Sequence, residues 1–380
     1  MQSFTDVQHV LRDLCPDHPV YCIYPHVYRE STKKFLDGFP GRVLYAIKAN
    51  NEPLVIRTLL EAGVRHFDCA SLVEIEQVRK ISGDAVCYFM NPVRIRDAAR
   101  IAQEQHGVRH FVVDHASGLT ALLQEIDAKS SVVFARMAVH HETAMVDLST
   151  KFGAKPDEVV ELLGSIAEHG AEPALAFNVG SVVMSPDAFV HAMNTARDVL
   201  ERLPFKVRLV DIGGGYPKSY PGFAAPPLDD YFAAIKGVAD LPLHKDGELL
   251  AEPGRALSAR GTSAVVRVLL RKDDRLYLND GMYGAFWELR FKGHERFAAR
   301  AFRNNAPLAG ATRAFQLFGP TCDSGDVMPG QVELPADIDV GDHIEFGSIG
   351  AYSLSGRTDF NGFYSDTVVR IGSSTALPPS

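Results

Sequence analysis

A lysine at the end of an apolar run is the first residue of this chain whose position suggests chemistry. Lys48 follows the apolar residues that open the stretch VLYAIKANN, residues 43–51, which has the character of a buried strand. An ammonium group buried without a partner is costly, so this lysine either points into water or serves a function. Because a lysine amine bonds covalently to aldehydes, Lys48 is a candidate for that chemistry.

A glycine triplet follows another apolar run, in the stretch DIGGGYP at residues 211–217. Three residues without side chains let backbone N–H groups approach an anion such as a phosphate, but they also fit a tight turn with positive φ. Both interpretations stay open at this point. Arg255, in the stretch EPGR, supplies a guanidinium that can pair with phosphate oxygens. Neither GxGxxG nor GxxxxGK[ST] is present, so dinucleotide and P-loop sites lack their signature.

A carboxylate, Glu252, lies three residues before Arg255. Beside a phosphate site it repels the ligand unless it faces a cationic part of the same molecule. Pyridoxal phosphate has this distribution of charge, with a phosphate on one side and a basic pyridine nitrogen on the other, and it forms a Schiff base with a lysine. Lys48, the glycine triplet and Glu252 together predict a pyridoxal phosphate site.

Eight apolar runs alternate with longer amphipathic stretches from residue 41 onward, the pattern of parallel strands joined by helices. The runs cover residues 43–49, 66–70, 86–92, 110–114, 132–139, 173–180, 209–215 and 248–255. The predicted helices between them include residues 53–63, 72–82, 95–106, 156–169 and 186–202. Eight such units fit a TIM-type (β/α)8 barrel, whose chemistry is found at the C-terminal ends of the strands. The candidate residues fall at such ends.

The pattern changes after Arg255 to strands and turns, as in TSAVVRVLL, DRLYLND and RAFQLFG. We therefore expect an α/β fold with two domains. A barrel is predicted over residues 25–257, and a β-sandwich or β-barrel domain is predicted from residues 1–24 and 258–380.

Composition sets limits on function. The chain has 380 residues, of which 46% are hydrophobic and 23% charged, as in ordinary globular proteins. A net charge of -8 without a basic block argues against nucleic acid as a partner. No apolar run approaches the roughly 20 residues that span a bilayer, and no signal peptide is evident, so no membrane partner and a cytoplasmic location are predicted.

The cysteine and histidine patterns predict no metal site. Five cysteines without CxxC spacing indicate neither a disulfide framework nor a zinc site. The adjacent histidines of HHET, residues 140–143, have no matching third ligand and are more typical of an exposed loop.

Nine short motifs occur in order across nearly the whole chain: YAIKAN, FDCAS..E, LSTKFGA, NVGS, DIGGGYP, EPGR, DGMYGAF, GPTCDSGD and GAY...FNGF. Together they resemble the fold-type III pyridoxal phosphate decarboxylases that act on ornithine, lysine and diaminopimelate, and among these the ornithine decarboxylases most. The resemblance implies an alanine-racemase-like barrel with a C-terminal β domain, and a homodimer with its active sites at the interface.

Site residues follow from the resemblance position by position. Lys48 would carry the cofactor, and Glu252 would face its pyridine nitrogen. The positions that match the phosphate-binding residues are Ser181, Gly214, Gly215, Arg255 and Tyr352. Asp68 and Glu74 match acidic positions near the lysine and the ring, and Arg136 matches a residue that supports the cofactor.

Substrate-binding and proton-donating residues are also implied. Cys322 and Asp323, in GPTCDSGD, would enter the site from the other subunit. There Cys322 would protonate the carbanion and Asp323 would meet the distal amine of the substrate. Tyr283 is also predicted to bind the substrate.

Two positions depart from the family pattern. Asn178 replaces the histidine that stacks on the cofactor ring, either as a tolerated substitution or as a mark of altered chemistry. Lys292 replaces an aspartate that helps to bind the distal amine of ornithine, so it either points into solvent or favours a substrate with a distal anion. An amino-acid conjugate would be such a substrate, whereas the retained Asp323 keeps ornithine and lysine open.

The predicted function is decarboxylation of an α-amino acid to the amine and carbon dioxide. Two alternatives are a catalytically silent relative that binds partners and a racemase that uses the same cofactor. The presence of Lys48, Glu252 and Cys322 favours an enzyme over the silent relative.

Overall fold

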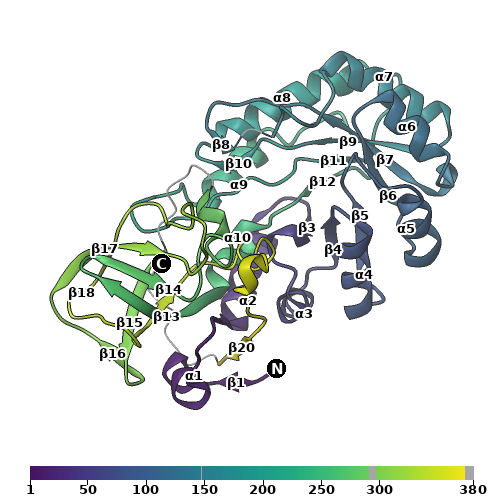
Figure 1. The fold of residues 1–380 in the computed structure, drawn as a ribbon. Helices are drawn as coiled ribbons and strands as arrows, with labels where there is room; N and C mark the ends of the chain where they lie inside the picture. The colour runs from purple at the N-terminus through teal and green to yellow at the C-terminus, as the bar shows by residue number, and fades with distance from the viewer. Residues whose placement is uncertain (147, 291–296, 373–380) are drawn as a thin grey trace. The chain divides into compact units, whose positions relative to one another are not determined.

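The computed structural model describes residues 1–146, 148–290 and 297–372, which fall into two compact units (Figure 1). Unit 1 is formed by Met1–Ser31, Lys218–Ala225 and the chain from Leu257 onward. Unit 2 is formed by Thr32–Pro217 and Pro226–Ala256.

Unit 2 is a closed barrel of eight parallel strands, in the order β11-β12-β3-β4-β5-β6-β7-β9. Every predicted run forms one of these strands, which confirms the barrel. The strands are β3 (Arg42–Ala46), β4 (His66–Cys69), β5 (Val86–Phe89), β6 (His110–Val113), β7 (Val132–Met137), β9 (Glu172–Phe177), β11 (Leu209–Asp211) and β12 (Glu248–Ala251). Inward side chains such as Leu44, Phe134 and Leu250 are buried and fill the interior, so the barrel is a packed core.

Helices join these strands and surround the barrel (Figure 1). They are α3 (Pro53–Glu61), α4 (Leu72–Ile81), α5 (Ala98–His106), α6 (Ala116–Leu123), α7 (Pro156–Glu168), α8 (Asp187–Glu201) and α9 (Leu228–Gly237). Helix α4 shows how the sequence starts them: the Ser71 side chain accepts a hydrogen bond from the Glu74 N–H and caps the first turn. A small antiparallel pair, β8 (Ala144–Val146) and β10 (Ser181–Val183), adds to the unit.

The first and seventh strands end earlier than predicted. β3 stops at Ala46, and Ile47–Ala49 form the 3-10 turn η1, in which the Asn50 N–H donates to the Ile47 carbonyl. β11 stops at Asp211, directly before the glycine triplet. Lys48 and the glycines therefore lie on the connections that follow the strands, outside the backbone hydrogen-bond ladder of the barrel.

Unit 1 is built on a sheet of ten strands that is mostly antiparallel. The strands are β1 (Ser3–Phe4), β2 (Val20–Ile23), β13 (Thr262–Lys272), β14 (Arg275–Leu278), β15 (Ala299–Arg303), β16 (Ala306–Leu308), β17 (Thr312–Phe318), β18 (Val332–Pro335), β19 (His343–Phe346) and β20 (Val368–Ile371). β13 pairs with β2, β14 and β19, and its Val266 and Val268 pack with Leu276 and Phe315 in one buried cluster. The C-terminal β domain of the predicted fold is thereby confirmed.

The remaining helical segments complete the described chain. They are α1 (Val7–Leu14), α2 (Pro25–Gly38), α10 (Arg255–Ser258) and the 3-10 turns η2 (Ala128–Ser130), η3 (Ala259–Gly261), η4 (Trp287–Arg290) and η5 (Phe360–Gly362). Within the described ranges, none of the helices is both long and apolar enough to cross a bilayer.

Candidate active site

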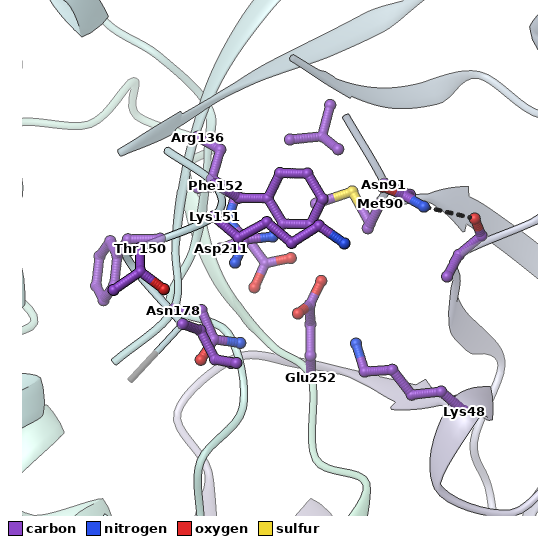
Figure 2. A pocket seen from close by; sticks show the side chains of 15 residues that line it. Lys48, Met90, Asn91, Arg136, Thr150, Lys151, Phe152, Asn178, Asp211 and Glu252 are labelled. Atoms are coloured by element: carbon purple, nitrogen blue, oxygen red, sulfur yellow. Dashed lines mark hydrogen bonds between the residues drawn. The ribbon is translucent and has the colours of Figure 1, made fainter. Parts of the chain in front are cut away.

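A cavity of about 520 Å³ lies in unit 2, bordered by residues at the C-terminal ends of the barrel strands (Figure 2). Its size is in the usual range for a site that binds a small molecule. The lining residues are Lys48, Ala70, Met90, Asn91, Val112, Arg136, Leu148, Thr150, Lys151, Phe152, Ala176, Phe177, Asn178, Asp211 and Glu252. The predicted residues Lys48, Arg136, Asn178 and Glu252 are thus brought together around one space.

Lys48 reaches the cavity from η1 and is held by a buried carboxylate. Its Nζ lies 2.9 Å from Asp68 Oδ2, and the two side chains are 46% and 1% exposed. The second oxygen of the carboxylate, Asp68 Oδ1, is buried without a hydrogen-bond partner. Asp68 therefore holds the amine in place, and the amine remains accessible to a small molecule. Both properties suit a nucleophile.

Glu74 supports the chain segment directly after β4, the strand that carries Asp68. Its Oε2 accepts a hydrogen bond of 2.6 Å from the Ala70 N–H at the start of α4. Burial raises the pKa of Glu74, and the charge of Asp68 adds to the effect. Glu74 is not among the residues that line the cavity, and its carboxylate instead contacts the backbone of Ala70, which does line it.

Two carboxyl groups, those of Glu252 and Asp211, point into the cavity opposite Lys48 (Figure 2). Burial raises the pKa of Glu252 well above its ordinary value, and the nearby charges of Asp211 and Asp68 raise it further. Burial likewise raises the pKa of Asp211 to about 7. The two carboxyl groups lie close together on the side of the cavity that faces Lys48. A ligand with a cationic group would be favoured beside them.

The glycine triplet after β11 packs too closely against its neighbours to carry side chains. A Cβ at Gly214 would lie 2.7 Å from the Glu252 carbonyl oxygen, and one at Gly215 would lie 2.8 Å from the Gly180 carbonyl oxygen. Gly213 and Gly215 also have φ of +71° and +103°. The positive φ values and the close contacts support the tight-turn interpretation of the triplet, and such a turn is compatible with phosphate binding by its backbone.

Backbone hydrogen bonds join this turn to the two segments that carry the other predicted phosphate-binding residues of unit 2. The Glu252 N–H donates to the Gly213 carbonyl at 2.9 Å, and the Val183 N–H donates to the Gly215 carbonyl at 3.0 Å. Ser181 is the first residue of β10, and Arg255 is the first residue of α10 and is buried. The segment after β12 and strand β10 are thus both hydrogen-bonded to the glycine turn after β11.

These residues fit pyridoxal phosphate. The amine of Lys48 reaches the cavity, where it can meet an aldehyde, and the glycine turn lets the chain pass close to its neighbours where no side chain would fit. The carboxyl groups of Glu252 and Asp211, whose pKa values are raised by burial, match the protonated nitrogen of a pyridine ring.

Arg136, on β7, and Asn178, directly after β9, line the cavity wall at two neighbouring strands. The Arg136 guanidinium lies 5.4 Å from the centre of the Phe152 ring, and the Lys151 ammonium lies 4.8 Å from it. Asn178 Oδ1 accepts a hydrogen bond of 3.0 Å from the Gly180 N–H. The amide that replaces the family histidine is therefore used in part to hold its own loop.

The remaining predicted residues belong to unit 1, apart from Lys292, which is outside the described residues. Tyr352 has a left-handed backbone with φ of 58°. The Tyr283 hydroxyl donates to Asp323 Oδ2, and the Tyr283 ring stacks on Phe360 at 4.5 Å. Cys322 is exposed, next to Asp323. Tyr283, Cys322 and Asp323 thus form one cluster.

Several lining residues were not predicted from the sequence. Asp211 was part of the DIGGGYP motif, but only its glycines were assigned a role. Lys151 and Phe152 lie in the LSTKFGA motif, between β7 and α7, where periodicity gives no direction for a side chain. The signal that would have identified Asp211 is its position as the last residue of a barrel strand.

Comparison with known proteins decides the family. Residues 27–259 match the family described as "Pyridoxal-dependent decarboxylase, pyridoxal binding domain". The chain belongs to this family. The enzyme is 32% identical over 346 residues to an ornithine decarboxylase of Schizosaccharomyces pombe, covering 86% of this chain and 76% of that protein. It is 30% identical over 331 residues to a lysine/ornithine decarboxylase of Selenomonas ruminantium, covering 85% of this chain and 81% of that protein.

The fold agrees with solved structures of such decarboxylases. A lysine/ornithine decarboxylase of Vibrio vulnificus complexed with putrescine superposes with a TM-score of 0.83 at 28% identity, covering 96% of this chain and 97% of that one. The protein is accordingly a pyridoxal-phosphate-dependent amino-acid decarboxylase with an alanine-racemase-like fold. The predicted family, cofactor and enzyme class are confirmed.

Proposed function

We propose that Lys48 binds the cofactor aldehyde and that Glu252 faces the pyridine nitrogen. The observation that carries this proposal is that Lys48 and Glu252 point into one cavity (Figure 2), and that the glycine turn follows Asp211, which lines the same cavity. We assign phosphate binding to Gly214, Gly215, Ser181, Arg255 and Tyr352. Arg136 and Asn178 border the ring.

Bound pyridoxal phosphate supplies a conjugated ring that accepts the electron pair left when carbon dioxide departs. The chain's residues prepare this step. Asp68 holds the Lys48 ammonium at 2.9 Å and so keeps the amine at the site when a substrate amine takes its place. Glu252 holds a proton at the pyridine nitrogen, which increases the ring's capacity for electrons.

Cys322 is proposed as the group that returns a proton to the substrate Cα. It is exposed in unit 1, and the Cys322 N–H donates to Asn361 Oδ1 at 3.1 Å, which fixes the loop that carries it. We propose that the enzyme is a homodimer in which Cys322 and Asp323 act in the partner's site. An exposed thiol beside a substrate-binding carboxylate suits this arrangement.

Replacing Cys322 with alanine is expected to lower kcat by roughly 10²- to 10⁴-fold, the usual contribution of a positioned proton donor, while the cofactor stays bound. Turnover and bound cofactor measured on the same preparation separate these effects. Cys15→Ala is the matched control, because Cys15 is also an exposed free cysteine of unit 1. Unchanged turnover and product in Cys322→Ala would remove the proposed role.

Mixing two inactive variants tests the shared site. A random mixture of Lys48→Ala and Cys322→Ala subunits should regain about a quarter of the wild-type activity, because half the dimers are mixed and each contains one intact site. No recovery after subunit exchange, verified by mass, would contradict a site shared across the dimer.

The substrate is proposed to be an α-amino acid conjugate whose distal end carries an anion. The Asp323 carboxylate already accepts a hydrogen bond from Tyr283. Arg290 lies 4.4 Å from the Tyr283 ring, and hydrogen bonds from Gly325 and Tyr283 together with the charge of Arg290 lower the pKa of Asp323. A distal ammonium finds this carboxylate partly satisfied and near a cation, whereas a distal anion is attracted to Arg290.

Ornithine and lysine are the second candidates. They are supported by the presence of Asp323 and by the printed names of the relatives in Schizosaccharomyces pombe and Selenomonas ruminantium.

Replacing Arg290 with alanine should raise kcat/KM for ornithine and lysine several-fold, because a cation near Asp323 is removed. The gain should shrink as salt concentration rises, since Arg290 is exposed and Asp323 is partly exposed. Arg313→Ala is the control, because Arg313 is an exposed arginine of unit 1 that pairs with Asp274 instead. Equal kcat/KM for Arg290→Ala and wild type would show that Arg290 does not select the substrate.

The function is tested by measuring carbon dioxide release from a panel of amino acids and amino-acid conjugates. We expect release with at least one α-amino acid and formation of the matching amine. Inversion at Cα without carbon dioxide, detected by chiral analysis, would favour the racemase. Cofactor binding without turnover of any substrate in the panel would favour the silent relative.

A further inference from the structure

Asp211 is the one carboxyl group of the cavity wall with no role in the proposed function. It is the last residue of β11, it is 1% exposed, and it lines the cavity. Its Oδ1 accepts a hydrogen bond of 2.8 Å from the Gly213 N–H, at the start of the glycine turn. Its Oδ2 is buried and receives no hydrogen bond while both carboxyl groups are ionised.

The carboxyl group of Asp211 faces that of Glu252 (Figure 2). Figure 2 shows the two carboxyl groups directed toward one another, with Glu252 between Asp211 and Lys48. The two side chains are joined by a hydrogen bond when one of them is protonated. Two ionised carboxylates in this position would repel one another in a site of low polarity, so the stable arrangement contains a shared proton.

The charged and titratable groups around the pair cannot replace that proton. The groups that act on Asp211 or Glu252 from neighbouring elements are Lys48 of η1, Asp68 of β4, Tyr88 of β5, Arg136 of β7 and Tyr216 after the glycine turn. Lys48 is already paired with Asp68, and Arg136 lies against Phe152. The two phenols remain neutral because burial raises the pKa of each.

We propose that Asp211 is a positioning residue that shares one proton with Glu252 and so stores, in the cofactor-free protein, the proton that the pyridine nitrogen needs. When cofactor binds, the O–H bond of Glu252 breaks and an N–H bond forms at the ring nitrogen, so no proton is taken from solvent. The proton then lies on the ring nitrogen, where its positive charge would offset the repulsion between the two carboxylates, while the Gly213 N–H holds Asp211 in place beside Glu252. Only this use of the proton depends on the proposed role of Glu252; the pair itself does not.

Asp211→Asn removes the shared proton and changes the shape of the side chain little. The asparagine Oδ1 still accepts from the Gly213 N–H, and its Nδ2 donates to an ionised Glu252, which no longer needs the proton. Asp114→Asn is the matched control. Asp114 follows β6 and accepts a hydrogen bond from a glycine N–H, that of Gly153 at 3.0 Å, but it does not act on Glu252.

The first readout is the thermal stability of the cofactor-free full chain as a function of pH. The pKa of Asp211 rises from 3.8 to about 7 on folding, and that of Glu252 rises too, so the folded protein binds more protons than the unfolded chain in this window. Stability is therefore lost as pH rises through it. Asp211→Asn should lose less stability over the same range, and Asp114→Asn should follow wild type. A curve for Asp211→Asn parallel to wild type would overturn the pair.

The second readout is proton uptake when pyridoxal phosphate is titrated into cofactor-free protein at pH 8 by calorimetry in buffers of different ionisation enthalpy. Asp211→Asn should take up about one proton more per site than wild type, because its Glu252 has none to give. Equal uptake would overturn the storage role. If Asp211→Asn does not fold, Glu252→Gln breaks the same pair and should flatten the stability curve; an unflattened curve overturns the pair as well.

Discussion

Replacing Lys48 with alanine will abolish decarboxylation, with a loss of roughly 10⁴-fold or more, the order expected when the nucleophile of a catalytic unit is removed. The physical reason is that Lys48 provides the amine of the cavity that Asp68 holds in place. Without it the cofactor binds only through its phosphate and ring contacts. The visible absorbance band of lysine-bound cofactor should disappear, and borohydride should no longer fix the cofactor to the chain.

Lys151→Ala is the matched control for this experiment. Lys151 is a second lysine of the same cavity, but its ammonium lies against the Phe152 ring and is not paired with Asp68. The band of bound cofactor should persist in this variant. If the band is instead lost in Lys151→Ala and intact in Lys48→Ala, the covalent role belongs to Lys151.

Glu252→Gln is expected to lower kcat by roughly 10²- to 10³-fold, the scale on which one preorganised electrostatic contact to a transition state acts. The glutamine keeps the size of the side chain but cannot carry the negative charge that stabilises a protonated ring nitrogen. Cofactor should still attach to Lys48, so the absorbance band should persist while turnover falls. Kinetics and absorbance measured on one preparation distinguish this loss from simple loss of cofactor.

Glu248→Gln is the control on the same strand. Glu248 is the first residue of β12 and pairs with Arg42, whereas Glu252 follows the other end of the strand. Its replacement should leave kcat unchanged. Full activity in Glu252→Gln would show that the ring nitrogen has another partner, and Asp211 would then be the first residue to test.

The barrel was predictable because each of its strands is a short apolar run between amphipathic stretches. The ends of the strands were harder to predict. VLYAIKA is apolar almost throughout, so the sequence gives no sign that β3 ends at Ala46 and that Lys48 sits on a 3-10 turn held by the Asn50 N–H. In unit 1, the strands β15, β16 and β18 were not predicted, since they are short and contain charged or proline residues.

The candidate site was predictable in part. Lys48, Glu252 and the glycine turn stand out because an amine, an acid and a bare backbone at strand ends are each unusual. Contacts between residues far apart in the sequence cannot be recognised from residue type and position alone. Asp211 gains its role only by facing Glu252, and the hydrogen bond between Tyr283 and Asp323 joins residues 40 positions apart. Such pairs depend on tertiary packing, which periodicity does not describe.

The central claim is that Lys48 is the residue to which the cofactor attaches, and peptide mapping tests it most directly. The protein is loaded with pyridoxal phosphate, reduced with borohydride, digested and analysed by mass spectrometry. We predict one modified peptide, which contains Lys48 and bears the mass of the reduced cofactor. Modification of a different lysine, or none in protein that releases carbon dioxide from its substrate, would contradict the account.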